Sequence, residues 1–160
     1  MLSVTFIVLG KCKESYLRDA ESEYKKRLTA FCKFNIIEIG AEPLPANPSD
    51  AQIAAALSKE GRKVLDAIPG GAYVYAMCIE GTERSSEQFS LELDRLAVTG
   101  HSSVAFLIGS SYGLSDEVKQ RADAKLSMSQ MTFPHQLARI MLLEQLYRAF
   151  QISSGGKYHK

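Results

Sequence analysis

The chain has 160 residues, 46% of them hydrophobic and 23% charged, and a formal net charge of +1, which is typical of one ordinary globular domain. No apolar run approaches the roughly 18 residues that a membrane span needs, and residues 1–9 lack the basic start and cleavage site of a signal peptide. We therefore expect a cytoplasmic protein without a membrane span.

The first half of the chain predicts helices and strands in alternation. Residues 2–9 have the apolar pattern of a strand, and residues 15–31 place apolar side chains at helical spacing. Residues 34–39 predict a second strand. After a Pro-rich loop, a Ser and a Gln three positions apart form a capping box, which predicts a helix over residues 49–67.

The alternation continues in the middle of the chain. Residues 72–79 predict a third strand, after which Gly81 is expected to open a turn. A second capping box predicts a helix over residues 85–98. Residues 103–108 are uninterruptedly apolar, which is typical of a strand at the buried centre of a parallel sheet. A short helix over residues 115–122 follows.

A fifth strand over residues 124–128 leads to the last helix, over residues 134–152. Pro134 suits the first turn of this helix, and Thr132 is the expected N-cap. Apolar side chains lie nearly all round the helix, so we expect it to be buried on more than one side. We expect the sheet to cover one side of this helix. We expect the other side to be covered either by the rest of a monomer or by a second copy of the chain in a twofold homodimer.

This alternation predicts a single domain over residues 1–160 of class α/β, with a mostly parallel sheet and helices on both faces. Ligands of such sheets bind at the carboxyl ends of the strands. Three segments follow strands in this way, namely residues 77–81, 109–113 and 128–133. The sequence therefore predicts a site built jointly from three loops.

The stretch 127–136 combines two methionines, a phenylalanine and small hydroxyl residues, which suits a loop around a flat, partly apolar ligand. His135 falls in the first turn of the last helix, where the helix dipole disfavours the imidazolium. A neutral imidazole there is a candidate for proton handling, although a capped helix start with a surface histidine explains the pattern equally well. Arg139, one turn later, is placed to reach a phosphate or carboxylate.

Charge and cysteine content indicate which binding partners and which metal sites to expect. Residues 119–160 hold 7 Lys+Arg and 2 Asp+Glu, so an anionic partner is expected at this end of the chain. Tyr158 could stack on a base, and Lys157 and Lys160 could pair with phosphates. The three cysteines are widely spaced without a CxxC motif, which indicates reduced thiols and no metal site.

Two other functions fit parts of the sequence. Residues 109–113 match GxSxG, the nucleophile elbow of serine hydrolases, with Ser111 as nucleophile and Asp116 or Asp123 preceding His135. The chain is short for that fold, and the HGGG-type oxyanion loop is absent. The same three loops also suit a non-catalytic module that binds RNA or a nucleotide.

Over its whole length the chain resembles the ribosomal RNA large subunit methyltransferase H family. The resemblance rests on four motifs: Phe106-Leu107-Ile108-Gly109, Thr132-Phe133-Pro134-His135-Gln136, Glu144-Gln145-Leu146-Tyr147-Arg148-Ala149 and Tyr158-His159-Lys160. It implies a SPOUT-class homodimer with a C-terminal trefoil knot that binds S-adenosylmethionine. It further implies methylation of N3 of a pseudouridine in a hairpin loop of 23S rRNA on the assembled ribosome.

The resemblance also implies roles for particular residues. As a hypothesis about the mechanism, loss of the proton from the target nitrogen calls for a base or for a group that stabilises the anion. His135 and His159 are the candidates, with Tyr158 and Arg139 expected to position the base or its phosphate. The family usually has two adjacent glycines where this chain has Gly109 and Ser110. The residues implied to touch the cofactor are Met77, Gly109, Met128, Ser129, Gln130, Met131, Thr132 and Phe133.

Overall fold

Five strands form one parallel sheet in the computed structural model, which describes residues 1–160. The strands are β1 (Ser3–Leu9), β2 (Lys33–Ile39), β3 (Tyr73–Glu83), β4 (Ser103–Ile108) and β5 (Ala124–Ser127). The helices are α1 (Ser15–Leu28), α2 (Asp50–Ala67), α3 (Ser86–Val98), α4 (Asp116–Arg121) and α5 (His135–Ser153). The strand order is β2-β1-β4-β3-β5. Because every pairing is parallel, all strands end at the same edge of the sheet. The predicted α/β class is confirmed.

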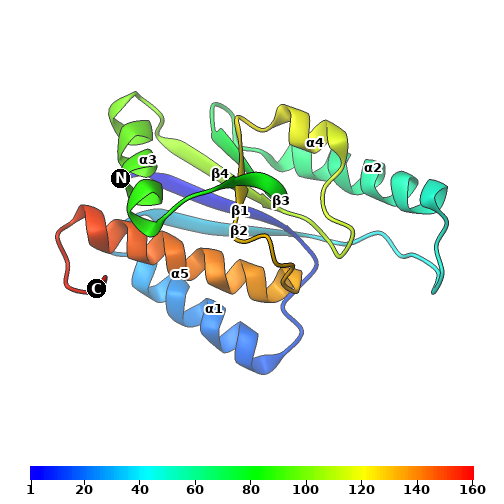
Figure 1. Ribbon diagram of the computed structural model, residues 1–160, viewed down its shortest axis with the longest axis horizontal. Helices are drawn as coiled ribbons and strands as arrows, with labels where there is room; N and C mark the ends of the chain where they lie inside the picture. Colours follow the sequence, from blue (N-terminus) through cyan, green and yellow to red (C-terminus); the bar gives the residue numbers. More distant parts are fainter.

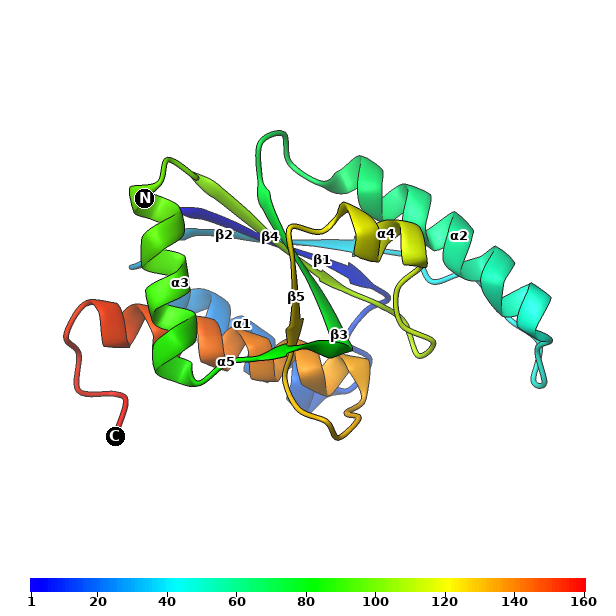
Figure 2. The same ribbon diagram turned by 45° about the horizontal axis from the view of Figure 1, so that its top comes forward.

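Helices cover both faces of the sheet, with α1, α3 and α5 on one face and α2 and α4 on the other (Figures 1 and 2). Successive side chains of a strand point to opposite faces, and this alternation builds two cores. Phe6 packs against Phe106 and against helix residues such as Leu142, whereas Ile7 packs with Val64 of α2 on the opposite face. The central strands β1 and β4 are buried along almost their whole length, as the uninterrupted apolar pattern of β4 predicted.

The two predicted capping boxes are both formed. The Ser49 hydroxyl accepts from the backbone N–H of Gln52, while the Gln52 side chain accepts from the backbone N–H of Ser49. Ser85 and Gln88 make the same pair of bonds at the start of α3. Each box satisfies two backbone donors that a helix start leaves without partners, which is why both helices begin where the sequence predicted.

The third strand is longer than predicted, and the turn expected at Gly81 is wrong. β3 continues to Glu83, with a shift in its pairing to β5 between Met77 and Thr82. A β-carbon at Gly81 would lie only 2.8 Å from the backbone of Leu126. Gly81 therefore permits the close approach of two strands at a bulge.

The ends of two helices also differ from prediction. α1 ends at Leu28, three residues before the predicted end. Thr132 does not cap α5, because the N-cap residue is Pro134 and no side chain accepts a bond there. α5 is covered by α1 and α3 as well as by the sheet (Figure 1), so it is buried on several sides within one chain. Neither this helix nor any other is long and apolar enough to cross a membrane.

Candidate functional site

A cleft of about 890 Å³ lies at the carboxyl ends of β3, β4 and β5. Its walls come from the three segments that the sequence predicted, although only two of them follow their strands, because residues 77–80 lie within the longer β3. Seven of the eight residues expected to touch a cofactor line it, while Gln130 lies in the same loop but faces solvent. The seven lining residues are Met77, Gly109, Met128, Ser129, Met131, Thr132 and Phe133.

The first wall is a tight loop over residues 109–113, called the glycine loop below. A β-carbon at Gly109 would overlap the backbone of Gly113, and Gly113 has a φ of +83°, a conformation that favours glycine. The loop is closed by a 2.8 Å hydrogen bond from the Gly113 N–H to the Ser110 carbonyl. Ser110 itself has no positive φ, so a side chain is tolerated where the family usually has its second glycine.

The second wall is the loop from Met128 to Phe133, which is shaped by its own serines. The hydroxyl of Ser127 donates to the carbonyl of Ser129 at 3.0 Å. The hydroxyl of Ser129 in turn accepts from the backbone N–H of Met131 at 3.0 Å. Such local side-chain bonds replace regular backbone pairing and fix a turn. They leave the Met131 side chain 73% exposed at the rim of the cleft.

The third wall comes from the bulged part of β3, residues 78–80. Glu80 forms a 2.6 Å ion pair with Lys119 of α4, and both residues line the cleft. The hydrogen bond from Lys119 lowers the pKa of the Glu80 carboxyl. Sequence reasoning missed this pair, because nothing local connects a strand end with a helix 39 residues later.

His135 is half-buried and lines the same cleft. Burial lowers the pKa of its imidazole, and the positive charges of Arg139 and Lys13 lower it further. The direction agrees with the neutral imidazole expected from the sequence, but the first cause is desolvation rather than the helix end. A neutral ring at neutral pH can accept a proton in the cleft.

Arg139 does not reach the cleft. Its side chain is 1% exposed, and its guanidinium donates to Glu21 at 3.1 Å, to Glu38 at 3.4 Å and to the carbonyl of Gly10 at 2.9 Å. These partners belong to α1, β2 and the loop after β1. The expectation that Arg139 contacts a phosphate or carboxylate ligand therefore finds no support, because its donors hold three parts of the scaffold together.

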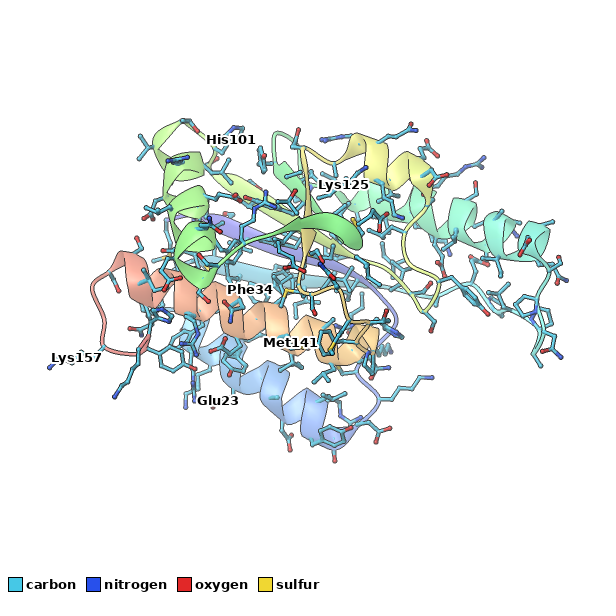
Figure 3. The ribbon with its side chains drawn as sticks, in the orientation of Figure 1. Glu23, Phe34, His101, Lys125, Met141 and Lys157 are labelled. Atoms are coloured by element: carbon cyan, nitrogen blue, oxygen red, sulfur yellow. The ribbon has the colours of Figure 1, made fainter.

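The last residues of the chain fold back onto the far end of α5 (Figure 1). The Tyr158 hydroxyl donates to Glu144 at 3.0 Å, and the guanidinium of Arg148 lies 4.7 Å from the centre of the Tyr158 ring. The predicted pair of Glu144 and Arg148 is formed at 2.6 Å. Lys157, in contrast, points away from the body of the protein (Figure 3).

His159 also lies far from His135 within one chain. Its Nε2 lies 2.7 Å from Glu87 and its Nδ1 lies 3.1 Å from Arg148. Arg148 follows His135 by 13 residues on α5, which corresponds to roughly 20 Å along the helix axis. The structure therefore brings His135 together with the loops that are expected to hold a cofactor, but not with Tyr158 and His159 of its own tail.

The residues of the hydrolase interpretation are not assembled into a triad. Ser111 is exposed on the glycine loop, and no hydrogen bond joins it to His135. Asp123 accepts from the backbone N–H of Val74 at 2.8 Å and does not contact His135. A serine nucleophile needs its base within hydrogen-bond reach and the base oriented by a third group, and neither contact is present.

Comparison with known proteins gives one consistent result. A family model described as "Predicted SPOUT methyltransferase" matches residues 2–159. The chain is 49% identical over 159 residues to "Ribosomal RNA large subunit methyltransferase H" of Bacillus cereus. It is 52% identical over 159 residues to the protein of that name from Clostridium acetobutylicum. Each match covers 99% of this chain and 100% of the relative.

Solved structures with similar folds are more distant in sequence. A probable methyltransferase from Bordetella pertussis superimposes with a TM-score of 0.56 at 16% identity, covering 93% of this chain and 96% of that one. The tRNA (m1G37) methyltransferase from Aquifex aeolicus gives a TM-score of 0.53 at 13% identity, covering 91% of this chain and 69% of that one. At these identities the likeness concerns the fold alone.

Proposed function

This chain belongs to the SPOUT methyltransferase family, and we propose that it transfers a methyl group from S-adenosylmethionine to N3 of a pseudouridine in 23S rRNA. The chain is an rRNA methyltransferase, as its full-length relatives are named. The cleft formed by the bulged part of β3 and the loops after β4 and β5 is the observation that carries the proposal, since it offers one open site next to a histidine whose pKa is lowered by burial. The relatives' names extend only to the large ribosomal subunit, so the nucleotide and the atom are part of the proposal.

The residues of the cleft fit an adenosyl sulfonium donor. Its volume of about 890 Å³ lies within the range of small-molecule and cofactor sites. Met77, Met128 and Phe133 offer apolar surface for an adenine ring, while the glycine loop brings backbone groups close. The resemblance also implies that the chain between β4 and α5 is threaded as a trefoil knot, which would hold these loops together.

When bound, S-adenosylmethionine supplies a methyl group already activated on sulfur. The remaining tasks belong to the chain, which must orient the donor, exclude water and remove the proton from the target nitrogen. His135 is the residue we assign to that proton, because its ring lines the cleft and is held neutral by burial. Methionine and phenylalanine side chains at the rim would exclude water from the reacting atoms.

We further propose that the enzyme acts as a homodimer with sites shared between two copies. Tyr158 and His159 lie too far along α5 to serve the cleft of their own chain. Three large apolar side chains near the cleft, Ile79, Met131 and Leu137, are between 39% and 73% exposed. A second copy that covered them would bring its tail to this cleft, in a twofold arrangement with two equivalent sites.

The substrate is proposed to be 23S rRNA in the assembled ribosome, in the cytoplasm. A net charge of +1 provides little attraction for naked RNA, because affinity rises with the number of phosphates neutralised. Recognition of the shape of a large folded particle would supply the affinity that this small net charge does not.

The test is methyl transfer from labelled S-adenosylmethionine to ribosomes purified from cells that lack this gene. We expect label in 23S rRNA on intact ribosomes, little label on protein-free 23S rRNA, and one N3-methylated pseudouridine by mass spectrometry of nuclease digests. Binding of the donor without any transfer to ribosomes would instead identify a non-catalytic RNA-binding module. Label at a nucleotide other than a pseudouridine would overturn the assigned target alone.

A further inference from the structure

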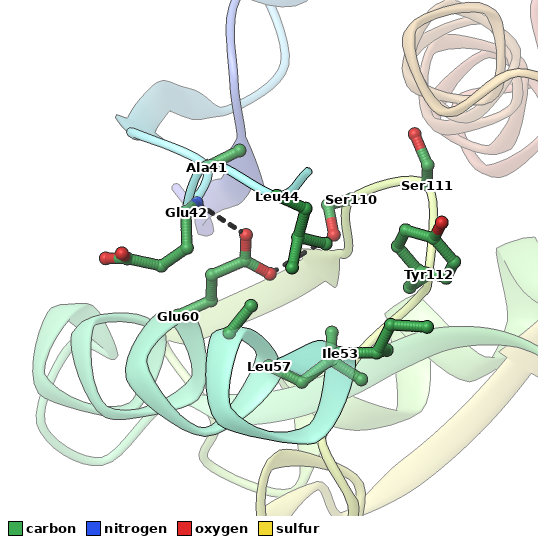
Figure 4. A pocket seen from close by; sticks show the side chains of 10 residues that line it. Ala41, Glu42, Leu44, Ile53, Leu57, Glu60, Ser110, Ser111 and Tyr112 are labelled. Carbon is green, nitrogen blue, oxygen red and sulfur yellow. Dashed lines mark hydrogen bonds between the residues drawn. The ribbon is translucent and has the colours of Figure 1, made fainter. Parts of the chain in front are cut away.

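Glu60 is a buried acid in the middle of α2, behind the glycine loop. Its side chain is 4% exposed. One carboxylate oxygen accepts from the hydroxyl of Ser110 at 3.1 Å, and the other accepts from the backbone N–H of Glu42 at 2.8 Å (Figure 4). Ser110 follows β4 and Glu42 follows β2, so a single carboxylate joins two loops at the ligand-binding edge of the sheet.

The bond to Glu60 is the only side-chain hydrogen bond that ties the glycine loop to the scaffold. Gly109 and Gly113 have no side chains, and those of Ser111 and Tyr112 are exposed and make no hydrogen bond. The remaining bond, from the Gly113 N–H to the Ser110 carbonyl, lies within the loop. It fixes the shape of the loop but not its place.

Packing behind residues 110–112 does not fix the position of the glycine loop either. A cavity of about 200 Å³ lies between the glycine loop and α2, with Leu44, Ile53 and Leu57 among its walls (Figure 4). A loop backed by a closely packed core could not move, because protein interiors are nearly incompressible. The buried side chains of Ile108 and Leu114 hold the two ends of the loop. Residues 110–112 between them have room to retreat from the cleft, and the hydroxyl of Ser110 makes the one side-chain hydrogen bond that opposes that movement.

We propose that Glu60 is a positioning residue that sets the place of the glycine loop through Ser110 and thereby the affinity for the methyl donor. The bond from the Glu42 backbone holds the carboxylate in one orientation, and the carboxylate then holds Ser110. This inference rests on the proposed function, since it assumes that the cleft binds the donor. It concerns this chain in particular, because a glycine at position 110 has no hydroxyl with which to make the bond.

The test measures binding of S-adenosylhomocysteine by calorimetry together with the melting temperature. Ser110→Ala should weaken binding about three- to tenfold, the span of one typical net hydrogen bond, and lower the melting temperature by no more than a few degrees. Ser110→Thr keeps the hydroxyl and should bind within about twofold of the wild type. Glu60→Gln keeps an acceptor for Glu42 and a donor for Ser110, so it should also bind nearly normally.

A double-mutant cycle separates positioning from general stability. Adding Ser110→Ala to Glu60→Ala should weaken binding no further than Glu60→Ala alone, because both changes release the same loop. Glu42→Ala is the matched control, since it removes a neighbouring carboxyl but keeps the backbone N–H, and it should bind normally. Wild-type affinity in Ser110→Ala, or additive losses in the double variant, would overturn the inference. Absence of binding by the wild type would instead refute the proposed function.

Discussion

The guanidinium of Arg139 donates a 2.9 Å hydrogen bond to the carbonyl oxygen of Gly10, 129 residues earlier in the chain. Gly10 directly follows β1 and has a φ of +87°, so the bond holds the backbone bend at the carboxyl edge of the sheet. The same guanidinium pairs with Glu21 and Glu38. Arg139 therefore connects the start of α5, which carries His135, to the first third of the chain.

Arg139→Ala should destabilise the fold by about 2–4 kcal/mol, because it leaves two carboxylates without their partner at a buried site. The two acids keep part of their hydration, so the loss is smaller than for a fully buried pair. For a chain of this length we expect a fall in the melting temperature of about 5–15 °C. Arg121→Ala, which removes an exposed pair at 3.7 Å, is the control and should change stability by less than about 0.5 kcal/mol. If Arg139→Ala lost methyl transfer but kept its stability, Arg139 would have a role in catalysis instead.

His135→Ala should lower the rate of methyl transfer about 10²- to 10⁴-fold, the usual contribution of a general base. Binding of S-adenosylhomocysteine should change far less, because the loops that would hold the donor are untouched. His101→Ala is the matched control, since His101 precedes β4 at the opposite edge of the sheet (Figure 3). Equal losses of binding and transfer, or no loss of either, would remove His135 from the proton step.

The pH dependence of the wild type should show an acid limb below pH 6.5. Burial and two nearby cations lower the pKa of His135 from its ordinary value of 6.5, and a base must be unprotonated to act. Activity therefore falls only as the pH drops through this lowered pKa and stays level between the ordinary value and neutrality. Profiles of kcat/KM report the free enzyme and are the measurement of choice. A limb centred above pH 6.5 would contradict the assignment of His135.

Gly109→Ala should weaken binding of S-adenosylhomocysteine by about five- to 150-fold. A β-carbon at this position overlaps the backbone of Gly113, so the glycine loop must open, and crowding of this kind costs typically about 1–3 kcal/mol. Gly70→Ala is the control, because a β-carbon added there would meet nothing within 4 Å and its φ is not positive. Calorimetry measures the affinity of both variants, and thermal denaturation shows whether both remain folded. If Gly109→Ala bound S-adenosylhomocysteine as tightly as Gly70→Ala, the glycine loop would not form part of the donor site.

A mixture of two inactive variants tests whether sites are shared between copies. If His135 and His159 act on one substrate from different chains, a dimer of His135→Ala with His159→Ala contains one intact site and one doubly altered site. Random exchange in an equal mixture should restore about a quarter of the wild-type rate, since half of the dimers are mixed and each has one working site of two. Sites confined to one chain would regain nothing on mixing.

Features that depend on neighbouring residues could be predicted from the sequence. The capping boxes at Ser49 and Ser85, and the buried strand Ser103–Ile108, are set by residues within one turn or one strand. The same holds for the loops after β4 and β5, because in a parallel sheet strand ends and ligand sites coincide. The segment 77–81 was predicted to line the cleft and does so, but as part of β3 and not as a loop after it.

Features that depend on distant residues could not be predicted. Helical spacing placed Arg139 on the face of His135, but nothing in the sequence showed that Glu21 and Glu38 would lie there. The extension of β3 past Gly81 depends on pairing with β5, more than 40 residues later. Glu60 was missed for the same reason, since its partner Ser110 lies 50 residues away.

The strand order has a consequence for synthesis of the protein. Two of the three cleft walls lie beyond residue 108, and α5, which closes one face of the sheet, is translated last. A chain made only as far as β5 exposes the apolar face of β1 that α5 covers, and it lacks the helix that carries His135. Rapid docking of α5 onto the sheet therefore protects the newly made chain from aggregation.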